Sequence, residues 1–448
     1  AFMKTDETVR IANRYTVQRL LGEGGMGKVY EVEDSVHGTR CALKVLSQKI
    51  SSEEALLQFR QEFWFMTRLA HPHIIQVHEY GVLDDQTPYF TMEIVPGQEL
   101  SELSNVSSEL AYDILIQSAQ ALGFIHSRRL VHADIKPENL RLTPDQQIKL
   151  MDFGLMQAID TRSNGQLTGT VAYMAPEIPQ RGVINESSDI YALGVMAYEL
   201  LAGVQPFVGT TVLDVIKAHI NSQPAPLHSF REDIPEALVR IVHKMLEKSQ
   251  TDRYANTSEL LEDLAQASGK SLSLSAEGRN SYLSSHVLVA RDQELDILQS
   301  ALDSLSSSSA SVFIGAPAGV GKSRLIEEFK IKAQLADVPF CQGICVEQGM
   351  ASYAPVVQAL NQVIPLSNKS QLERFGPVLA HLLPQLEAQD IFPREDFDPR
   401  QQKITLFEPV LDHVKLQIIF SPGNFGKQDV ILTLRAINRS QILILAKH

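Results

Sequence analysis

The pattern of apolar and polar positions changes twice along the chain. From Tyr15 to about Leu264, short alternating runs come first and long helical periods follow, which is typical of an α+β unit. A Ser-rich stretch, 266–285, cannot bury much apolar surface and is interpreted as a linker. From His286 apolar segments resume, and a strand-like run at Val312–Ile314 leads into a glycine-containing turn. The pattern predicts two folded domains joined by a linker.

The composition is that of an ordinary globular protein. With 44% hydrophobic and 21% charged residues among 448, the chain is not disordered, collagen-like or a disulfide scaffold. Its 40 basic and 53 acidic residues give a net charge of −13, which disfavours non-specific binding to nucleic acid or anionic membranes. Cys41, Cys341 and Cys345 lack the spacing of a disulfide framework, and Cys341 and Cys345 are interpreted as buried thiols, not metal ligands.

Membrane and secretory signals are absent from the sequence. No uninterrupted apolar run approaches the ~20 residues that span a bilayer. The segment Ala1–Arg10 lacks the apolar core of a signal peptide. We therefore expect a cytoplasmic protein with no nucleic-acid or membrane partner, and the oligomeric state is unknown from the sequence.

A glycine-rich segment, Gly22–Gly27, lies between two strand-like runs. Its glycines let the backbone approach phosphate oxygens closely, with main-chain N–H groups as donors. A G-x-G-x-x-G pattern alone is weak evidence, and a plain hairpin turn is the alternative. A dinucleotide site requires a helix directly after the glycines. Because the alternating, β-branched Val29–Val32 follows instead, the pattern disfavours a dinucleotide site.

A single lysine, Lys44, lies within the apolar strand Cys41–Leu46. A strand lysine that faces solvent is the ordinary alternative. A helix is predicted over Ser51–Leu69, because a capping box begins it and apolar residues recur at helical spacing. Glu62 falls within the apolar stripe, and a carboxylate on a buried face needs a partner. We predict an ion pair between Lys44 and Glu62.

Two polar motifs follow, and with them the chain resembles a known family. Val131–Asn139 reads V-H-A-D-I-K-P-E-N before a short strand, and Asp152–Gly154 reads D-F-G after another. Together with the glycine loop and the strand lysine, these motifs over roughly Tyr15–Leu264 resemble the protein kinases, specifically the bacterial Ser/Thr kinases similar to the eukaryotic ones. The resemblance implies an α+β bilobal protein kinase fold that transfers the ATP γ-phosphate to protein Ser/Thr hydroxyls.

The resemblance implies a role for each motif residue. Asp134 would accept or orient the substrate hydroxyl proton, and Lys136 would neutralise the transferring phosphoryl group. Asn139 and Asp152 would hold Mg²⁺, while Lys44, paired with its glutamate, would hold the α- and β-phosphates. The other ATP-contacting positions would be Leu21, Gly22, Glu23, Gly24, Gly25, Met26, Gly27, Val29, Ala42, Glu93 and Val95, with Met92 as the gatekeeper.

Further positions resemble the Ser/Thr-specific pattern. Lys136, two residues after the catalytic aspartate, and Thr170, in G-T-V-A-Y-M-A-P-E, are similar to residues of Ser/Thr kinases. Glu177 and Arg253 resemble the ion pair that holds the activation segment. Asp189 resembles the buried carboxylate that braces the catalytic-loop backbone.

Two positions depart from the family pattern. Ala133 stands where an arginine commonly clamps a phosphorylated activation-loop residue, so the resemblance does not imply control by phosphorylation within 161–170. Arg141 stands where an apolar residue usually lies under the adenine ring. Three alternatives are open for Arg141: stacking on the base, replacement of a leucine by its aliphatic stem, or a side chain that points at solvent.

The second domain contains a glycine-rich turn between a strand and a helix. Gly315–Ser323 resembles a Walker A loop, with Ala316 at the position of the usual first glycine. Together with the preceding segment 288–295, it makes 286–414 similar to part of an AAA-type P-loop ATPase module of the STAND signalling class, an α/β fold. The residues implied to bind nucleotide and its metal are Gly319, Gly321, Lys322 and Ser323.

Hydrolysis by this second domain is not implied. The nearest candidate for a Walker B strand, Val410–Asp412, is short and follows a proline. The tail 415–448 no longer resembles the family, although 441–448 is strand-like. We therefore expect an incomplete nucleotide-binding fold, either truncated or altered at its C-terminus.

Three functional hypotheses follow. The first is a Ser/Thr protein kinase that uses ATP and Mg²⁺ on protein substrates, with a second domain that binds nucleotide and regulates it. The second is a nucleotide-sensing scaffold whose output is protein interaction. The third makes the P-loop module the principal enzyme. The complete set of implied metal-binding and proton-handling residues favours the first.

Overall fold

The structure, a computed structural model, describes most of the first 270 residues and selected segments beyond them. The described residues are 9–24, 27–47, 53–83, 85–159, 170–270, 291–304, 310–314, 321–336, 338, 340–344, 357, 362, 430–435 and 442–447. The chain divides into two compact units: Ala1–Ser51, Glu79–Thr91 and Val287–His448 form one, and Ser52–His78 and Met92–His286 form the other. Within the described residues, no helix combines the length and apolar character needed to cross a membrane.

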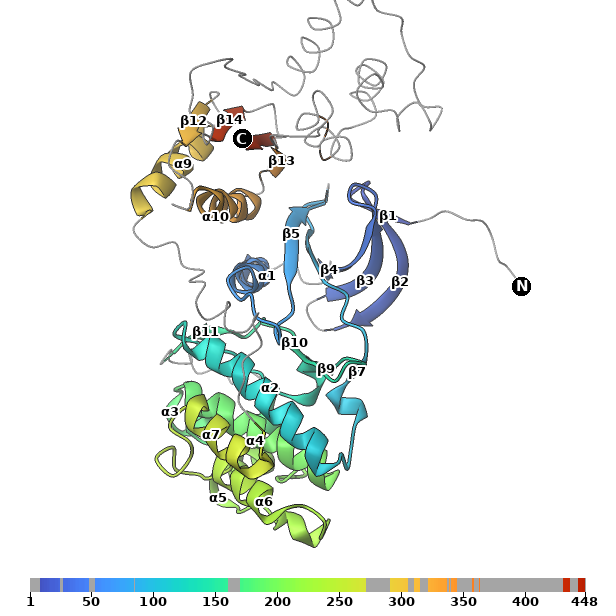
Figure 1. The fold of residues 1–448 in the computed structure, drawn as a ribbon, viewed down its shortest axis with the longest axis vertical. Helices are drawn as coiled ribbons and strands as arrows, with labels where there is room; N and C mark the ends of the chain where they lie inside the picture. Colours follow the sequence, from blue (N-terminus) through green and yellow to red (C-terminus); the bar gives the residue numbers. More distant parts are fainter. Residues whose placement is uncertain are drawn as a thin grey trace, which may run out of the picture. The chain divides into compact units, whose positions relative to one another are not determined.

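A six-stranded sheet begins the fold (Figure 1). Its strands, in the order in which they lie across the sheet, are β1 (Arg10–Ile11), β2 (Tyr15–Glu23), β3 (Gly27–Asp34), β4 (Thr39–Leu46), β6 (Pro88–Met92) and β5 (Val77–Val82). Antiparallel pairing of β2, β3 and β4 buries Tyr15, Val32 and Leu43 on one face of the sheet. The predicted glycine loop therefore joins two paired strands, as the alternating pattern after it indicated.

Seven helices are described between the first sheet and residue 270. They are α1 (Glu53–Met66), α2 (Ser108–His126), α3 (Glu177–Arg181), α4 (Glu186–Ala202), α5 (Val212–Asn221), α6 (Glu236–Met245) and α7 (Thr257–Ser268). The predicted helix Ser51–Leu69 corresponds to α1 but ends earlier, because the backbone tightens into a turn in which the Leu69 amide donates to the Met66 carbonyl. Ser51 lies outside the described residues.

Helix α4 lies at the centre of this helical region. Nearly all of its side chains are buried, as expected for a helix that is apolar on all sides. A capping box between Asn185 and Ser188 begins it, and Gly203, with φ +73°, ends it. Helices α2 and α6 pack against it. Because Asp189 lies in its first turn, this buried helix fixes the position of that carboxylate.

Short strands and 3₁₀ turns shape the loops beside these helices. The strands are β7 (Gln98–Glu99), β8 (Leu130–Val131), β9 (Leu140–Leu142), β10 (Ile148–Leu150) and β11 (Gln157–Ala158), and the turns are η1 (Leu100–Glu102), η2 (Pro137–Asn139), η3 (Val171–Tyr173) and η4 (Leu227–Ser229). One small sheet has the order β10-β9-β7, and β11 pairs with β8. Strands β8 and β9 bracket the motif His132–Asn139 and hold both of its ends.

The C-terminal region contains a four-stranded sheet and two described helices. These are α9 (Asp292–Ser304), β12 (Ala310–Ile314), α10 (Lys322–Leu335), β13 (Phe340–Ile344), β14 (Val430–Arg435) and β15 (Ile442–Lys447). The strand order is β12-β14-β15-β13, with β13 parallel to β15 and the other pairs antiparallel. Leu298, Ile326 and Phe329 form its buried core. The two strands from the tail 415–448 thus lie between β12 and β13.

Candidate active site

The catalytic-loop backbone is held by one buried carboxylate. Asp189, 1% exposed, accepts hydrogen bonds of 2.9 Å from the amides of His132 and Ala133 and one of 2.8 Å from His126 Nε2. Burial opposes ionisation of Asp189, but these hydrogen bonds outweigh it and lower its pKa. Ala133 has φ +66°, a strained value for a residue other than glycine. The brace predicted for Asp189 is confirmed, and it holds Ala133 in this conformation.

The carboxylate of Asp134 is surrounded by side-chain donors. Lys136 Nζ lies 2.7 Å from Oδ2, and Asn139 Nδ2 donates to the same oxygen at 2.9 Å. Thr170 donates to Oδ1 through both its amide and its hydroxyl, each at 3.2 Å. Lys136 Nζ also donates to Thr170 Oγ1 at 3.0 Å. The structure thus brings three predicted residues, Asp134, Lys136 and Asn139, into one cluster together with Thr170.

Asn139 and Asp152 lie at the ends of neighbouring backbone segments. The Met151 amide donates to the Asn139 carbonyl at 2.8 Å, which ties the residue before Asp152 to the end of the catalytic loop. Both described hydrogen bonds of the Asn139 side chain use Nδ2, so Oδ1 is the atom left to face a cation. The oxygens offered by Asn139 and Asp152 match the ligand preference of Mg²⁺.

The turn at Asp152 is strained and locally supported. Asp152 has φ +56°, and its Oδ1 accepts a 3.2 Å hydrogen bond from the Gly154 amide. Phe153 is 1% exposed and packs edge-on against the ring of His132, with centroids 4.9 Å apart. Gln58 of α1 donates to the Gly154 carbonyl at 2.8 Å. Sequence reasoning missed Gln58, because an amide side chain within a helix carries no motif.

The predicted pair of Lys44 and Glu62 stays a prediction, because the two residues belong to different units. Glu62 is buried on α1, at 2% exposure, as the apolar stripe indicated. Lys44 is half-buried on β4, with its ammonium nitrogen 5.6 Å from the centroid of the Phe90 ring.

The predicted hinge residues follow the end of β6. Met92 is buried at the last residue of this strand. Glu93 forms a 2.7 Å ion pair with Lys149, and its backbone amide donates to the Gln76 carbonyl at 2.9 Å. Val95 is half-buried. The side chain and the backbone amide of Glu93 therefore both anchor the segment.

The Arg141 side chain forms a hydrogen bond that the sequence did not indicate. Its Nη2 donates to the Gly97 carbonyl at 2.9 Å, and the two short strands β7 and β9 pair Glu99 with Arg141. Gly97 has φ +109°, and a Cβ there would clash with the carbonyl of Leu142. Arg141 is half-buried, and its orientation beside a bound nucleotide stays a prediction. The Gly97 acceptor lies far away in sequence, so no local pattern reveals it.

The glycine loop closes on itself between β2 and β3. Gly24 and Gly27 exchange backbone hydrogen bonds of 2.9 and 3.3 Å. A Cβ at Gly27 would clash with the carbonyl of Val45, so only glycine fits there. Gly25 and Met26 lie outside the described residues. The remaining predicted positions are placed as follows: Leu21, Gly22, Glu23 and Gly24 are exposed, Val29 is half-buried and Ala42 is buried.

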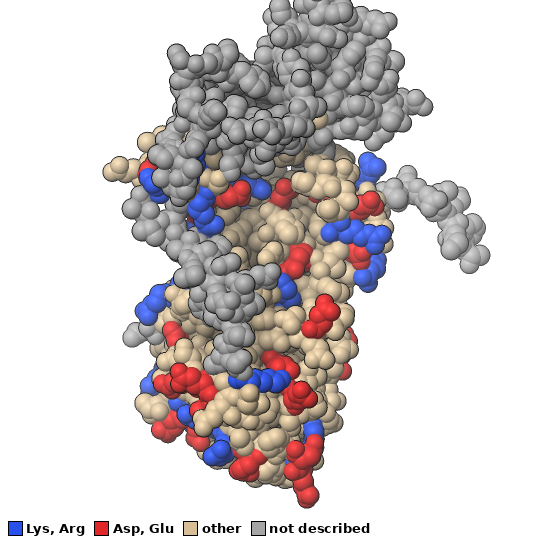
Figure 2. Space-filling model, in the orientation of Figure 1, with Lys and Arg blue, Asp and Glu red and all other residues tan. Residues whose placement is uncertain are grey.

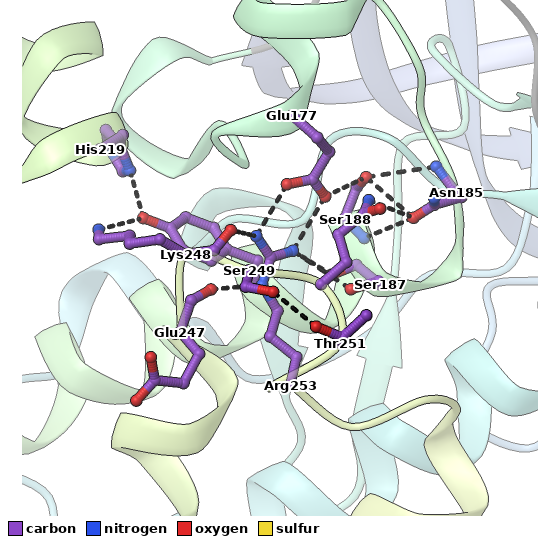
Figure 3. A network of polar contacts seen from close by, with 12 residues as sticks. Glu177, Asn185, Ser187, Ser188, His219, Glu247, Lys248, Ser249, Thr251 and Arg253 are labelled. Atoms are coloured by element: carbon purple, nitrogen blue, oxygen red, sulfur yellow. Dashed lines mark hydrogen bonds and ion pairs between the residues drawn. The ribbon is translucent and has the colours of Figure 1, made fainter.

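The ion pair predicted between Glu177 and Arg253 is confirmed (Figure 3). Arg253 Nη1 and Nη2 donate to the two carboxylate oxygens at 2.9 and 2.8 Å, the bidentate geometry that favours arginine. Ser188 Oγ donates to Glu177 Oε1 at 2.8 Å. Burial opposes ionisation of Glu177, yet the guanidinium lowers its pKa. Both side chains are almost fully buried, so the pair joins the start of α3 to the segment that follows α6.

Only the helical end of the predicted phosphate loop is described. Gly321, with φ +91°, caps α10, and Lys322 and Ser323 are its first two residues. The predicted residue Gly319 and the candidate Walker B strand Val410–Asp412 lie outside the described residues. Helix α10 extends to Leu335.

Acidic and basic side chains are interspersed on the face drawn in Figure 2.

Comparison with known proteins identifies the two regions. Residues 15–264 match the family described as Protein kinase domain, and residues 287–416 match AAA ATPase domain. Serine/threonine-protein kinase PknA of Mycobacterium tuberculosis (strain H37Rv) is 37% identical over 258 residues, 55% of this chain and 59% of that protein. PrkC of Bacillus subtilis (strain 168) is 32% identical over 267 residues, 58% of this chain and 41% of that protein.

The chain thus spans less than two thirds of the length of these relatives. The kinase match nevertheless covers more than half of this chain, from the first long strand to α7. The expected fold, a kinase with a sheet-rich first lobe and a helical second lobe followed by an AAA-type module, is confirmed. The chain belongs to the protein kinase domain family.

Proposed function

We propose that this chain is an ATP-dependent protein kinase that phosphorylates serine and threonine hydroxyls. The observation that carries the proposal is the cluster at Asp134, where Lys136, Asn139 and Thr170 all donate to one carboxylate. An aspartate held in this way can accept a hydrogen bond from an incoming alcohol and orient its oxygen toward a phosphorus atom. The curated relatives named as serine/threonine-protein kinases support the same assignment.

The charges of the cluster suit phosphoryl transfer. Catalysis of this reaction depends on positioning and on neutralising charge at the transferring group more than on covalent chemistry. Lys136, with its side chain 21% exposed, combines a fixed contact to Asp134 with access to an incoming phosphate. Asp134, at 10%, remains open enough to meet a substrate hydroxyl and receive its proton.

The oxygens of Asn139 and Asp152 fit a magnesium ion. Among the described residues, no group of three or more His, Cys, Asp or Glu side chains could hold a metal by itself. A site with few protein oxygens and substrate phosphates as the other ligands is the mode that Mg²⁺ favours. When bound, the ion would offset the charge of the phosphates. Asn139 also keeps the carboxylate of Asp134 in place through its amide nitrogen.

We further propose that the second domain binds nucleotide and regulates the kinase. A strand and a helix flank the predicted phosphate loop, and the region matches the AAA ATPase domain family. The scaffold hypothesis and the hypothesis of a principal P-loop enzyme remain as alternatives. A cytoplasmic location stays a prediction.

Phosphoryl transfer to peptides tests the proposal. The full chain is incubated with γ-labelled ATP, Mg²⁺ and matched peptides that differ only in Ser, Thr or Tyr, and modified sites are mapped by mass spectrometry. We expect transfer to Ser and Thr and at least about tenfold less to Tyr. Absence of transfer with an intact fold would support the scaffold instead.

Two lysine variants separate the remaining alternative. Lys44→Ala should abolish peptide phosphorylation, whereas Lys322→Ala should leave the catalytic step intact. If total ATP consumption fell with Lys322→Ala and persisted in Lys44→Ala, the P-loop module would be the principal enzyme. Lys217→Ala, at an exposed position of α5, is the matched control.

A further inference from the structure

One hydrogen bond joins α1 to the turn that follows Asp152. Gln58 Nε2 donates to the Gly154 carbonyl at 2.8 Å, across 96 positions of sequence. Both residues belong to the same compact unit of the chain. Neither the sequence motifs nor the proposed chemistry assigns a role to this side-chain amide.

The turn at Asp152 depends on its neighbours for its shape. Asp152 has φ +56°, a backbone conformation that costs free energy in a residue with a side chain. Asp152 is also exposed, so packing in the core does not fix it. The buried ring of Phe153 anchors the turn on one side. The hydrogen bond to the Gly154 carbonyl adds a second anchor, two residues from the strained position.

Helix α1 presents the Gln58 amide from a fixed place. The neighbouring residue Phe59 is fully buried, and Phe63, one turn later, is 1% exposed. These rings set the position and the rotation of the helix. Gln58 itself is half-buried, which limits the rotamers that its side chain can adopt. Forming the hydrogen bond to Gly154 therefore orders little that is not ordered already.

The hydrogen bond from Gln58 continues to the carboxylate of Asp152. Gln58 holds the carbonyl of Gly154, and the Gly154 amide donates to Asp152 Oδ1 at 3.2 Å. On the other side of Asp152, the Met151 amide donates to the Asn139 carbonyl at 2.8 Å. Bonds on both sides of Asp152 thus support the placement of the two residues whose oxygens fit a magnesium ion.

We propose that Gln58 is a positioning residue for the metal-binding turn. Its amide holds Gly154 and so keeps Asp152 in the strained conformation that offers its carboxylate to Mg²⁺. Strain opposes this conformation, and one hydrogen bond has a free energy of similar size, so loss of the bond lowers the population of the competent turn. The apparent affinity for Mg²⁺ falls in proportion to that population. This inference rests on the proposed kinase function.

Two substitutions of Gln58 remove the donor and keep the length of the side chain. Gln58→Met has no polar hydrogen, and Gln58→Glu replaces the amide nitrogen by an oxygen that, when ionised, only accepts. Methionine, glutamate and glutamine have similar helix propensities, so α1 itself should be unaffected. Gln61→Met and Gln61→Glu, at an exposed position of the same helix, are the matched controls.

Hydrogen exchange of the segment 152–156 in the full chain is the first readout. The Gly154 and Met156 amides are hydrogen-bonded within this turn. Without ATP and metal, exchange should be about fivefold faster in both Gln58 variants, the effect of one hydrogen bond. Titration of Mg²⁺ at saturating ATP should slow the exchange, and the half-maximal Mg²⁺ concentration should be about fivefold higher in both variants. Both Gln61 variants should match the wild type.

Peptide phosphorylation is the second readout. The Mg²⁺ concentration that gives half the maximal rate should rise about fivefold in Gln58→Met, while the KM for a Ser/Thr peptide stays within about twofold. A merely structural role of Gln58 would lower the rate at every Mg²⁺ concentration without a shift of the half-maximal concentration.

The outcomes separate this inference from the proposed function. Exchange at 152–156 equal to that of the wild type in both Gln58 variants would overturn the positioning role. So would an unshifted half-maximal Mg²⁺ concentration, or an equal shift in the Gln61 variants. A wild-type chain that transfers no phosphate would instead refute the kinase proposal, and exchange with and without Mg²⁺ and ATP would still decide whether Gln58 positions the turn.

Discussion

Asp134 and Asp189 are two carboxylates of one helical region with opposite environments. Asp134 is partly open and receives its hydrogen bonds from Lys136, Asn139 and Thr170. Asp189 is sealed in the core and receives its bonds from two backbone amides and from His126. An aspartate thus serves chemistry at one position and support of the backbone at the other, and the kind of hydrogen-bond donor distinguishes the two roles.

The difference between side-chain and backbone donors gives the two carboxylates different roles. Side-chain donors around an accessible carboxylate can rearrange when a substrate arrives, so Asp134 is suited to chemistry. Backbone donors to a buried carboxylate fix the chain, so Asp189 is suited to holding His132 and Ala133 in place. Substitutions at the two positions should therefore separate turnover from stability.

The largest effect is expected from removal of the Lys136 ammonium group beside Asp134. Lys136→Met should lower kcat by about 10²–10³, because it removes a charge aimed at the transferring phosphoryl group. Its melting temperature should stay close to that of the wild type. Steady-state kinetics with a Ser/Thr peptide checks this, and Lys217→Met, at an exposed position of α5, is a control away from Asp134. A tenfold or smaller loss would show that Lys136 only packs.

The next effect should appear as lost stability. Asp189→Asn removes the charge and presents an amide where the backbone N–H groups need an acceptor, which should cost about 3 kcal/mol of unfolding free energy. Urea denaturation measures it, and Asp145→Asn, exposed in the turn before β10, is the control. Stability equal to the wild type would mean that the catalytic loop does not depend on this brace.

Acidic pH should lower the free energy of unfolding, because histidines buried in the core must take up protons. Burial lowers the pKa of His71 to about 3 and that of His219 to about 4, from an ordinary value of 6.5. The unfolded chain therefore binds more protons than the folded one between these limits, and stability falls as pH falls below about 6.5. At pH 5 the loss should be about 2 kcal/mol for each histidine.

Urea denaturation at pH 7.5 and pH 5.0 checks this dependence. The pKa values of Asp34, Glu177 and Asp189 are lowered below ordinary carboxyl values, so their contribution is lost only at more acidic pH. His71→Phe should recover about 2 kcal/mol of the difference between the two pH values. Equal stability at both pH values would contradict the neutral, buried histidines.

The smallest effect is expected at Arg141. Arg141→Leu removes one partly exposed hydrogen bond to Gly97, which should cost about 1 kcal/mol of stability and leave kcat within about twofold. Thermal denaturation and kinetics measure the two quantities, with Arg141→Lys as the variant that keeps a charge. A loss as large as that of Asp189→Asn would place Arg141 among the main supports of the fold.

The sequence predicts the parts of this protein that depend on local spacing. The alternating runs of β2 and β3, the buried face of α1 and the residues around Asp134 all follow from short motifs. The hydrogen bond from Arg141 to Gly97 joins segments far apart in the sequence, and so do the hydrogen bonds that link Lys248, Tyr191 and His219. No local pattern contains them. The pairing of β14 with β12 is non-local in the same way.

The Glu177–Arg253 ion pair is confirmed, whereas the Lys44–Glu62 ion pair stays a prediction. The Lys44–Glu62 pair was inferred from a carboxylate on the buried face of a helix, and the Glu177–Arg253 pair from its resemblance to a family motif. Glu177 and Arg253 lie within one unit, where the structure shows both partners in contact. Lys44 and Glu62 lie in different units, so the sequence pattern and the burial of Glu62 are the support for their contact.

The most direct test of the central claim is phosphate transfer by Asp134→Asn. Wild type and variant are compared in a single turnover with γ-labelled ATP and a Ser/Thr peptide, and the melting temperature of each is recorded. We expect a loss of about 10³-fold or more in the rate of transfer with an unchanged melting temperature. Transfer by the folded variant at a rate near that of the wild type would contradict the assignment of Asp134 as the group that receives the substrate hydroxyl.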